Sequence, residues 1–453
     1  MKEQEQGEMT VDALRGAADS GEIHTVLLAM VDMQGRLQGK RLTVGHFLGE
    51  VLQHKAEGCN YQLAVDIDMK TVDGYSHASW SDGYGDFVFA PDLSTLRRIP
   101  WQDGTALVMC DLEWGDGSPV MVSPRQILRR QIERLAERNL VAFAGTELEF
   151  LVFRNTYEDA WNRAYRGLTP ATQYNVDYAL LDTQRLEPLM ARIRNEMQSA
   201  GLKTLDSKGE CNLGQHEINF NYQHVLRTAD EHALYKNGAK EIAAQEGYAL
   251  TFMAKYDERE GNSCHIHLSV RSPDGSPVMA GEQGLSALGQ HFVAGLLHGM
   301  RELTLFLAPN INSYKRYVKG SFAPTALAWG VDNRTCALRL VGHGASMRIE
   351  NRVPGGDVNP YLALSAMIAA GIHGMDSEMP LEAPYAGNAY ESRKPRVPGT
   401  LREARVLFSE SGIARSAFGD QVVEHYLNMA RVEIEAFDAA ITDWERFRGF
   451  ERM

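Results

Sequence analysis

Three segments of this chain interrupt an apolar, strand-like run with functional side chains two residues apart. The interrupting residues are Glu147 and Glu149 in the first segment, His265 and His267 in the second, and Arg348, Glu350 and Arg352 in the third. Residues i and i+2 of a strand point to the same face of a sheet, so each segment presents its polar groups together. Gathering such groups without partners costs several kcal/mol apiece. Metal ions and a polyanionic ligand are the partners that would offset this cost.

The carboxylates of these segments suit a hard divalent cation. Apolar residues flank Glu147 and Glu149 on both faces, which predicts a central strand, and a buried carboxylate pair has a raised pKa unless a cation neutralises it. A second pair, Glu210 and Glu217, brackets a glycine-containing loop. Each pair taken alone also fits a solvated strand edge or an ordinary hairpin. The histidine pair fits half of a zinc site or two core histidines, but the excess of carboxylates favours Mg²⁺ or Mn²⁺.

Five arginines lie close together in the sequence around the third segment. They are Arg316, Arg334, Arg339, Arg348 and Arg352. Arginines at alternating strand positions beside a glutamate suit phosphate binding and neutralisation of transition-state charge, although a single arginine is more often part of a structural ion pair. No Walker A loop or Rossmann glycine motif follows a predicted strand. The combination predicts metal-assisted phosphoryl transfer; a metal hydrolase would use the same ligands but fits the arginines less well.

The elements that would position these residues mix helices with strands. Hydrophobic periodicity predicts helices over residues 124–138, 183–200, 229–246, 285–305, 359–373 and 420–447. It predicts strands over residues 141–153, 215–221, 249–254, 263–271, 335–341 and 346–353. Long, glycine-containing turns connect the motif strands, so we expect an α+β catalytic domain with a curved antiparallel sheet.

The first quarter of the chain has a different pattern. Residues 1–9 have the composition of a disordered tail, and a helix over residues 11–20 and short strands such as 25–32 and 105–111 are predicted after it. The turn-rich segment 114–124 ends in Ser123 and Pro124, which suit an N-cap and a first helical position. We therefore expect one domain over residues 1–113 and a second over residues 114–453.

Bulk composition narrows the class of protein. The chain has 453 residues and a formal net charge of −13, which argues against a nucleic-acid-binding protein. Its five cysteines form no CxxC pair, so neither a disulfide framework nor a structural zinc site is expected. The N-terminus is not a signal peptide, and no apolar run reaches the roughly 20 residues of a membrane helix. A cytoplasmic protein without a membrane partner is the expectation.

Seven ordered motifs, spread over nearly the whole chain, resemble the type I-like glutamine synthetase family. They are GTELEF (145–150), GQxEI (214–218), CHIHLS (264–269), NSYKR (312–316), NRxxALR (333–339), RIENR (348–352) and NPYLA (359–363). Residues 91–101 are similar to part of that family's N-terminal β-grasp domain. The resemblance implies a small N-terminal β-grasp domain and a large C-terminal catalytic domain, whose curved antiparallel sheet is flanked by helices.

The resemblance also implies a role for each matching residue. One metal site would use Glu149, Glu210 and Glu217, and the other Glu147, His265 and Glu350. ATP would be bound by Tyr222, His267, Ser269, Arg339 and Arg348. The other substrates would be bound by Gly261, Arg316, Phe322, Arg334 and Arg352, with Arg334, Arg339 and Glu350 acting in catalysis.

Family chemistry supplies the expected cofactors and partners. Two or three Mg²⁺ or Mn²⁺ ions per active site would assist ATP in phosphorylating the γ-carboxylate of L-glutamate, and an amine would then attack the γ-glutamyl phosphate. Members form double rings, so the resemblance implies a homo-oligomer, a dodecamer of two hexameric rings. In these rings the N-terminal domain of one subunit closes its neighbour's site.

Three departures from the family pattern concern the substrates. The family's PGxEAP segment is KGSFAP here (319–324), so the uncharged Phe322 stands where a glutamate binds ammonium and takes its proton. The ammonium-binding FDGSS motif is absent, and Asp66, Asp68 and Asp73 lie in that region without an assignable equivalent. Glu260 stands where the family's glutamate site usually has asparagine.

With these departures the chain resembles the γ-glutamyl-amine ligases of the family. The segments VDMQGRLQGKR, KGECNLGQ and SFAPTALAWG are most similar to the actinobacterial γ-glutamylethanolamide synthetase type. The expected activity is ATP-dependent ligation of the glutamate γ-carboxyl to a small primary amine, with ethanolamine favoured. The alternatives are a γ-glutamylpolyamine synthetase, an authentic glutamine synthetase, which Phe322 disfavours, and a non-catalytic scaffold, which the six intact metal-ligand positions disfavour.

Overall fold

The main sheet is built around strand β7 (Val141–Phe153), which carries the first motif. The structure is a computed structural model that describes residues 7–282 and 284–453. Among these residues the main sheet has nine strands: seven follow the order β15-β16-β17-β12-β7-β9-β8, and β10 and β11 also pair with β7. The other strands are β8 (Thr204–Gly209), β9 (Gln215–Phe220), β10 (Gln223–His224), β11 (Ala249–Thr251), β12 (Cys264–Arg271), β15 (Trp329–Val331), β16 (Leu338–Val341) and β17 (Arg348–Asn351). All pairs are antiparallel except β15 with β16, as expected for a predominantly antiparallel sheet.

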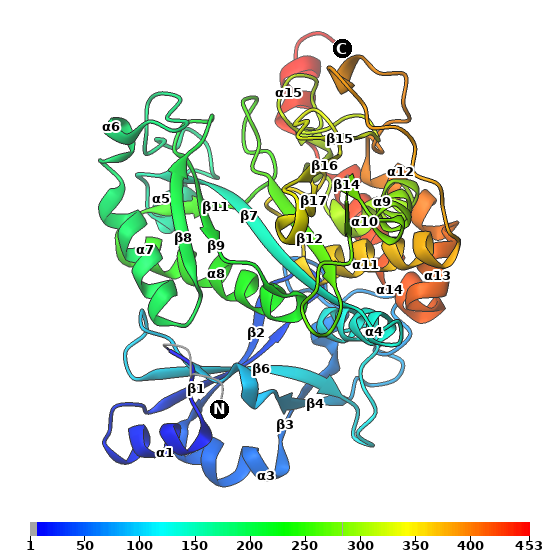
Figure 1. Cartoon of the computed structure of the whole chain (residues 1–453). Helices are drawn as coiled ribbons and strands as arrows, with labels where there is room; N and C mark the ends of the chain where they lie inside the picture. The colour runs from blue at the N-terminus through cyan, green and yellow to red at the C-terminus, as the bar shows by residue number, and fades with distance from the viewer. Residues whose placement is uncertain (1–6, 283) are drawn as a thin grey trace.

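A smaller mixed sheet precedes the main one and lies at the opposite end of the molecule (Figure 1). Its strands are β1 (Thr25–Val31), β2 (Leu37–Thr43), β3 (Ala56–Cys59), β4 (Asp86–Pro91), β5 (Arg97–Arg98) and β6 (Thr105–Glu113). β1 pairs with β6 in parallel and with β2 antiparallel. The helices beside it are α1 (Val11–Asp19), α2 (Val44–His46) and α3 (Leu52–His54). The α+β class with a small N-terminal sheet is therefore confirmed.

Helices flank the main sheet (Figure 1). They are α4 (Pro124–Ala136), α5 (Tyr157–Asn162), α6 (Leu180–Thr183), α7 (Glu187–Ser199), α8 (Val225–Gln245), α9 (Ala287–Gly299), α10 (Thr304–Leu307), α11 (Pro360–Asp376), α12 (Leu401–Ser409), α13 (Gly412–Phe418), α14 (Asp420–Ala439) and α15 (Asp443–Gly449). A two-stranded ribbon, β13 (Ala280–Gly281) with β14 (Gly284–Leu285), precedes α9. No helix within the described ranges is long and apolar enough to cross a membrane.

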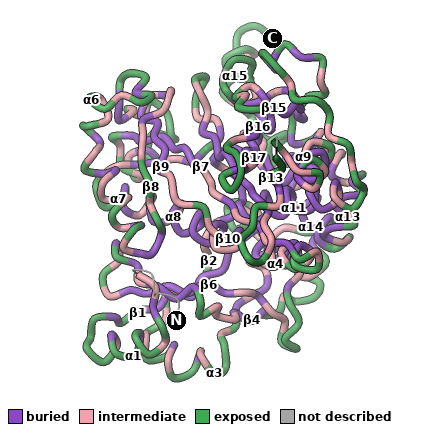
Figure 2. The backbone as a smooth tube through the Cα atoms, viewed as in Figure 1, coloured by how far each residue is buried: buried purple, intermediate pink, exposed green. Residues whose placement is uncertain are grey.

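Helix α11 is buried along almost its whole length and forms the centre of the helical layer (Figure 2). The side chain of Asn359 caps it by accepting from the Tyr361 amide, and Pro360 occupies its first turn. Its contact with α9 requires glycine, because a Cβ on Gly295 would lie 2.2 Å from the Ala370 carbonyl oxygen. Asn359 also donates to the Met33 carbonyl at 3.0 Å, so the same cap connects α11 to the N-terminal part of the chain.

The elements differ from the sequence prediction in several places. Residues 285–305 form two helices, α9 and α10, and residues 420–447 form α14 and α15, because Thr442 and Glu445 make a capping box that starts a new helix. The strands predicted over 249–254 and 335–341 are shorter, and β8 was not predicted. The prediction of a disordered tail over residues 1–9 is wrong at its end. Met9 is buried, and its backbone amide donates to the Leu96 carbonyl at 2.9 Å. Residues 1–6 of that tail lie outside the described residues.

Candidate active site

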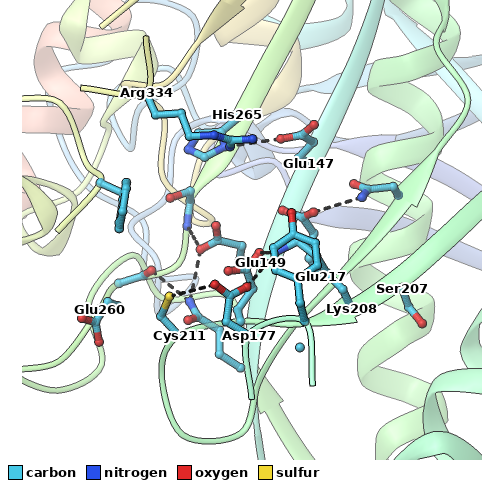
Figure 3. A pocket seen from close by; sticks show the side chains of 18 of the residues that line it. Glu147, Glu149, Asp177, Ser207, Lys208, Cys211, Glu217, Glu260, His265 and Arg334 are labelled. Atoms are coloured by element: carbon cyan, nitrogen blue, oxygen red, sulfur yellow. Dashed lines mark hydrogen bonds and ion pairs between the residues drawn. The ribbon is translucent and has the colours of Figure 1, made fainter. Parts of the chain in front are cut away.

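The register of the main sheet brings the three motifs side by side. His265 on β12 pairs with Glu147 on β7, and His267 pairs with Glu350 on β17. On the other side of β7, Glu149 pairs with Glu217 on β9. Four of these residues line a cavity of about 700 Å³ (Figure 3): Glu147, Glu149, Glu217 and His265. The sequence predicted that the polar residues within each motif share one face of a strand. The register of the sheet also places the three motifs next to one another.

Glu149, Glu210 and Glu217 form the first candidate metal group, the set that the resemblance implies. One carboxylate oxygen from each lies within 4.8 Å of the others. Burial, and then the charge of Glu210, raise the pKa of Glu149 to about 8; burial and three neighbouring glutamates raise the pKa of Glu217 well above its ordinary value. Carboxylates crowded in this way are neutralised by protons or by a cation. The group therefore fits a divalent metal ion.

The second candidate group surrounds Glu147 and Glu350. Within 4.8 Å of one another lie ligand atoms of Glu147, Glu350 and His267. His265, the implied ligand, is equally close to the two carboxylates: its Nδ1 lies 3.4 Å from Glu147 Oε2 and 3.5 Å from Glu350 Oε1. Burial lowers the pKa of His265 to about 4, so its ring is neutral and available as a ligand, and its buried Nε2 has no hydrogen-bond partner.

Three of the arginines surround Glu350 and the cavity. Arg339 Nη1 donates to Glu350 Oε2 at 3.0 Å, and Arg352 Nη1 donates to Glu350 Oε1 at 2.5 Å. Arg334 lines the same cavity with Arg339 and Arg352. Burial alone would raise the pKa of Glu350, but His265 and Arg352 hold it below its ordinary value. This end of the cavity is therefore suited to an anionic group such as phosphate.

Arg316 lies behind the cavity wall. Only 2% of it is exposed, and its Nη2 donates to the carbonyls of Arg352 at 2.9 Å and of Pro354 at 2.6 Å. Its stem packs against Gly261, where a Cβ would lie 2.9 Å from Arg316 Cγ and 2.2 Å from the Ala254 carbonyl oxygen. Arg316 thus fixes the backbone that follows β17, while Gly261 lines the cavity.

A second cavity, of about 510 Å³, adjoins the first and shares Glu147 with it. Four residues implied for ATP binding line it: Tyr222, His267, Ser269 and Arg348. The sequence did not single out Arg271, whose guanidinium lies 5.4 Å from the centre of the Phe143 ring and 5.5 Å from that of Tyr222. Its position two residues after Ser269 on the same strand face was the available signal. The aromatic and cationic walls suit a nucleotide whose phosphates extend toward Glu147.

Phe322 is on the wall of the first cavity and adopts an unusual backbone conformation. Its φ of 58° lies in the left-handed region, which an aromatic residue rarely occupies. Arg352 Nη2 donates to the Phe322 carbonyl at 3.3 Å, and the Tyr390 hydroxyl donates to the next carbonyl, that of Ala323, at 2.9 Å. Phe322 is 57% exposed and contributes an apolar side chain to a cavity that charged groups also line.

Strand β8 contributes residues that the sequence did not reveal. Lys208 forms an ion pair with Glu210 and lies 4.5 Å above the centre of the Tyr178 ring. It also lies 3.4 Å from Asp177, so a loop before α6 and strand β8 together form one side of the cavity. Gln215 was missed as well: its Nε2 lies 3.1 Å from Glu149 Oε2 and 3.0 Å from the Gly261 carbonyl oxygen.

The fold and this site are typical of an enzyme that uses metal ions in phosphoryl transfer. The profile of the glutamine synthetase catalytic domain matches residues 121–448. The chain is 62% identical over 443 residues to γ-glutamylethanolamide synthetase of Streptomyces coelicolor, covering 98% of this chain and 96% of that protein. It is 35% identical over 453 residues to glutamate–isopropylamine ligase of a Pseudomonas species, covering 98% of both.

A solved structure has the same fold. The complex of GmaS with ADP superposes with a TM-score of 0.85 at 25% identity, covering 97% of this chain and 99% of that one. The chain belongs to the glutamine synthetase family. It is an ATP-dependent carbon–nitrogen ligase of the glutamate–amine ligase class, and enzymes of its family use divalent metal ions.

Proposed function

We propose that this enzyme joins the γ-carboxyl group of L-glutamate to ethanolamine. The observation that carries the proposal is the presence of a complete metal-ligand set beside an aromatic residue, Phe322, at the cavity wall. An uncharged ring neither binds a bare ammonium ion as a carboxylate does nor accepts its proton, but it packs against a carbon-bearing amine. The 62% identical relative, a γ-glutamylethanolamide synthetase, supports ethanolamine as that amine.

In this proposal the two ligand groups hold two Mg²⁺ or Mn²⁺ ions, with a third ion between the phosphates and the protein. Glu149, Glu210 and Glu217 hold one ion, and Glu147, Glu350 and the neighbouring histidine His265 hold the other. Bound metal ions would neutralise phosphate charge and orient the transferring group. The crowding of buried carboxylates supports this assignment, because a cation relieves their repulsion.

The substrates are assigned to the two cavities. ATP occupies the cavity lined by Tyr222, His267, Ser269 and Arg348, with its phosphates at Glu147. Glutamate lies in the first cavity near Gly261 and Arg352, whose backbone Arg316 holds in place. Arg334 and Arg339 neutralise the phosphoryl group, and Glu350 orients Arg339.

The reaction proceeds in two displacements. A γ-carboxylate oxygen of glutamate attacks the terminal phosphorus of ATP, and the bond to the bridging oxygen breaks, releasing ADP. The ammonium group of the amine first gives up a proton to solvent, and its neutral nitrogen then attacks the carbonyl carbon of γ-glutamyl phosphate. The carbon–oxygen bond to phosphate breaks, and the nitrogen loses a second proton to give the amide. Arg334 and Arg339 stabilise the charge on the phosphate as it is transferred and as it leaves.

The proposed assembly is a homo-dodecamer of two hexameric rings in the cytoplasm. Exposed apolar residues on the N-terminal part, including Ile67 and Trp80, and beside the cavity, Leu180 and Leu181, support burial between subunits. The five free cysteines fit a reducing compartment. We also propose that residues 1–113 and 114–453 are separate domains. Mass photometry of the purified enzyme tests the assembly, and a monomer would contradict it.

Phosphate release from ATP and glutamate, measured with a panel of amines, tests the proposed function. Ethanolamine should give the highest kcat/KM, with methylamine-sized and larger monoamines below it and ammonium far below. Preferred turnover of putrescine or spermidine would identify a polyamine ligase, and ammonium turnover equal to that with ethanolamine would identify a glutamine synthetase. No turnover with any amine, in the presence of Mg²⁺ or Mn²⁺, would favour a scaffold.

A further inference from the structure

The acidic residues of the first cavity differ in whether they already have a partner. Seven of them line it: Glu147, Glu149, Asp177, Asp206, Glu210, Glu217 and Glu260. Six accept hydrogen bonds or ion pairs from side chains or amides of the described residues. Four of those six also belong to the two candidate metal groups. Glu260 is the remaining one: its carboxylate has no partner in the described parts of the chain.

The backbone that carries Glu260 is held firmly in place. Asn212, which is 1% exposed, donates through Nδ2 to the Glu260 carbonyl at 2.7 Å and to Asp257 Oδ1 at 3.0 Å. The next residue, Gly261, is fixed by Gln215 Nε2, 3.0 Å from its carbonyl oxygen. A carboxylate without a partner therefore projects from a rigid position, which is the arrangement of a preformed binding group.

Glu260 lies at the end of the cavity away from the phosphate-binding arginines. Figure 3 shows Glu260 beside Cys211 and Asp177, whereas Arg334, His265 and Glu147 lie at the opposite end. Among the residues that line the cavity, Lys208 is the one lysine beside the three arginines, and it is already paired with Glu210 and Asp177. An anionic substrate group is therefore drawn to the arginine end and a cationic one to the Glu260 end.

We propose that the carboxylate of Glu260 binds the ammonium group of the incoming amine by an ion pair. This inference rests on the proposed function, because that reaction requires an amine that is protonated in water at neutral pH. The cavity wall at Phe322 is uncharged, and the other carboxylates have partners, so Glu260 is the group left to compensate the positive charge as the amine leaves water. Glu260 is a specificity-determining residue: it selects a cationic acceptor, and Phe322 packs against its carbon atoms.

Replacing Glu260→Gln tests the inference, with steady-state phosphate release as the measurement. Two acceptors are compared: ethanolamine, which is cationic at neutral pH, and hydroxylamine, which is mostly uncharged. The KM for ethanolamine should rise by about tenfold or more, because a partly buried ion pair is lost. The KM for hydroxylamine, glutamate and ATP should change by less than about twofold. Glu258→Gln removes the same charge from an exposed position on the same loop and should change none of these values.

The outcomes separate the inference from the proposed function. An equal rise in KM for both acceptors, or no rise for ethanolamine, would overturn the role of Glu260 while leaving the ligase activity intact. A rise in KM for glutamate alone would show that Glu260 binds the α-ammonium group of glutamate instead. That result would also overturn the inference. Failure of the parent enzyme to use any amine would reject the proposed function and this inference with it. Glu260→Asp, which keeps the charge, provides a second variant: it should retain most of the ethanolamine affinity that Glu260→Gln loses.

Discussion

Glu147 and His265 face each other across β7 and β12, with Glu147 Oε2 3.4 Å from His265 Nδ1. A slip of one residue between these strands would move every side chain of one strand to the other face of the sheet. The candidate metal group of Glu147, His265 and Glu350 would then come apart, because these residues lie on the neighbouring strands β7, β12 and β17. The apolar residues that alternate with the motif residues determine the register, so the core of the protein also positions its chemistry.

Removal of a metal ligand should abolish both activity and stabilisation by metal. Glu217→Gln removes one oxygen from the group with Glu149 and Glu210, so we expect phosphate release to fall by more than about 100-fold. In the parent, Mg²⁺ should raise the unfolding midpoint, because it binds the folded state only. That rise should be much smaller in Glu217→Gln, measured by differential scanning fluorimetry with and without Mg²⁺. Glu133→Gln, at an exposed position on α4, should behave as the parent.

Restoring a carboxylate at the cavity wall should shift the enzyme toward ammonium. Phe322→Glu places a negative charge at a position that lines the cavity, and we expect ammonium-dependent phosphate release to increase while ethanolamine turnover decreases. Phe322→Leu keeps the wall apolar and should not improve ammonium use. The ratio of kcat/KM for the two amines is the measurement, and unchanged selectivity in Phe322→Glu would contradict the role of the aromatic wall.

Arg316 should contribute mainly to stability. Its guanidinium is buried and donates to three backbone carbonyls after β17, a geometry that an ammonium group does not reproduce. Arg316→Lys should lower the free energy of unfolding by about 2–4 kcal/mol, read as a lower urea midpoint. Arg402→Lys, an exposed partner of Asp438, should have almost no effect. A rise in the KM for glutamate without loss of stability would instead indicate direct substrate binding.

Acid should lower the stability of the fold through two buried histidines, one on α14 and one in the loop before β4. Burial lowers the pKa of His425 well below its ordinary value of 6.5 and also lowers that of His77, and their ring centres lie 5.1 Å apart. The unfolded chain then binds more protons than the folded one below about pH 6.5, so stability falls as pH falls. The unfolding midpoint should drop less between about pH 7.5 and 5.5 in His425→Gln than in the parent. The prediction would be contradicted if the unfolding midpoints of His425→Gln and the parent fell equally with pH.

The motif strands were predictable because their signal is local. Apolar residues alternate with Glu147 and Glu149 on β7, and His265 and His267 interrupt a run of similar character on β12. Strand β8 was not predictable, because its sequence TLDSKG is polar and becomes a strand by pairing with β9. Likewise, nothing in the sequence distinguishes buried Arg316 from the arginines that line the cavity, because burial depends on which segments pack around it.

By itself, the sequence determined the class of chemistry, since side-chain type and two-residue spacing dictate which groups share a strand face. It also indicated the uncharged wall at Phe322, because that depends on residue identity alone. The tertiary structure decided how the motifs meet, which of the seven cavity carboxylates already have partners, and that Glu260 does not. These are properties of pairing between distant segments, and ion pairs such as Lys208 with Glu210 form only after the sheet has set their separation.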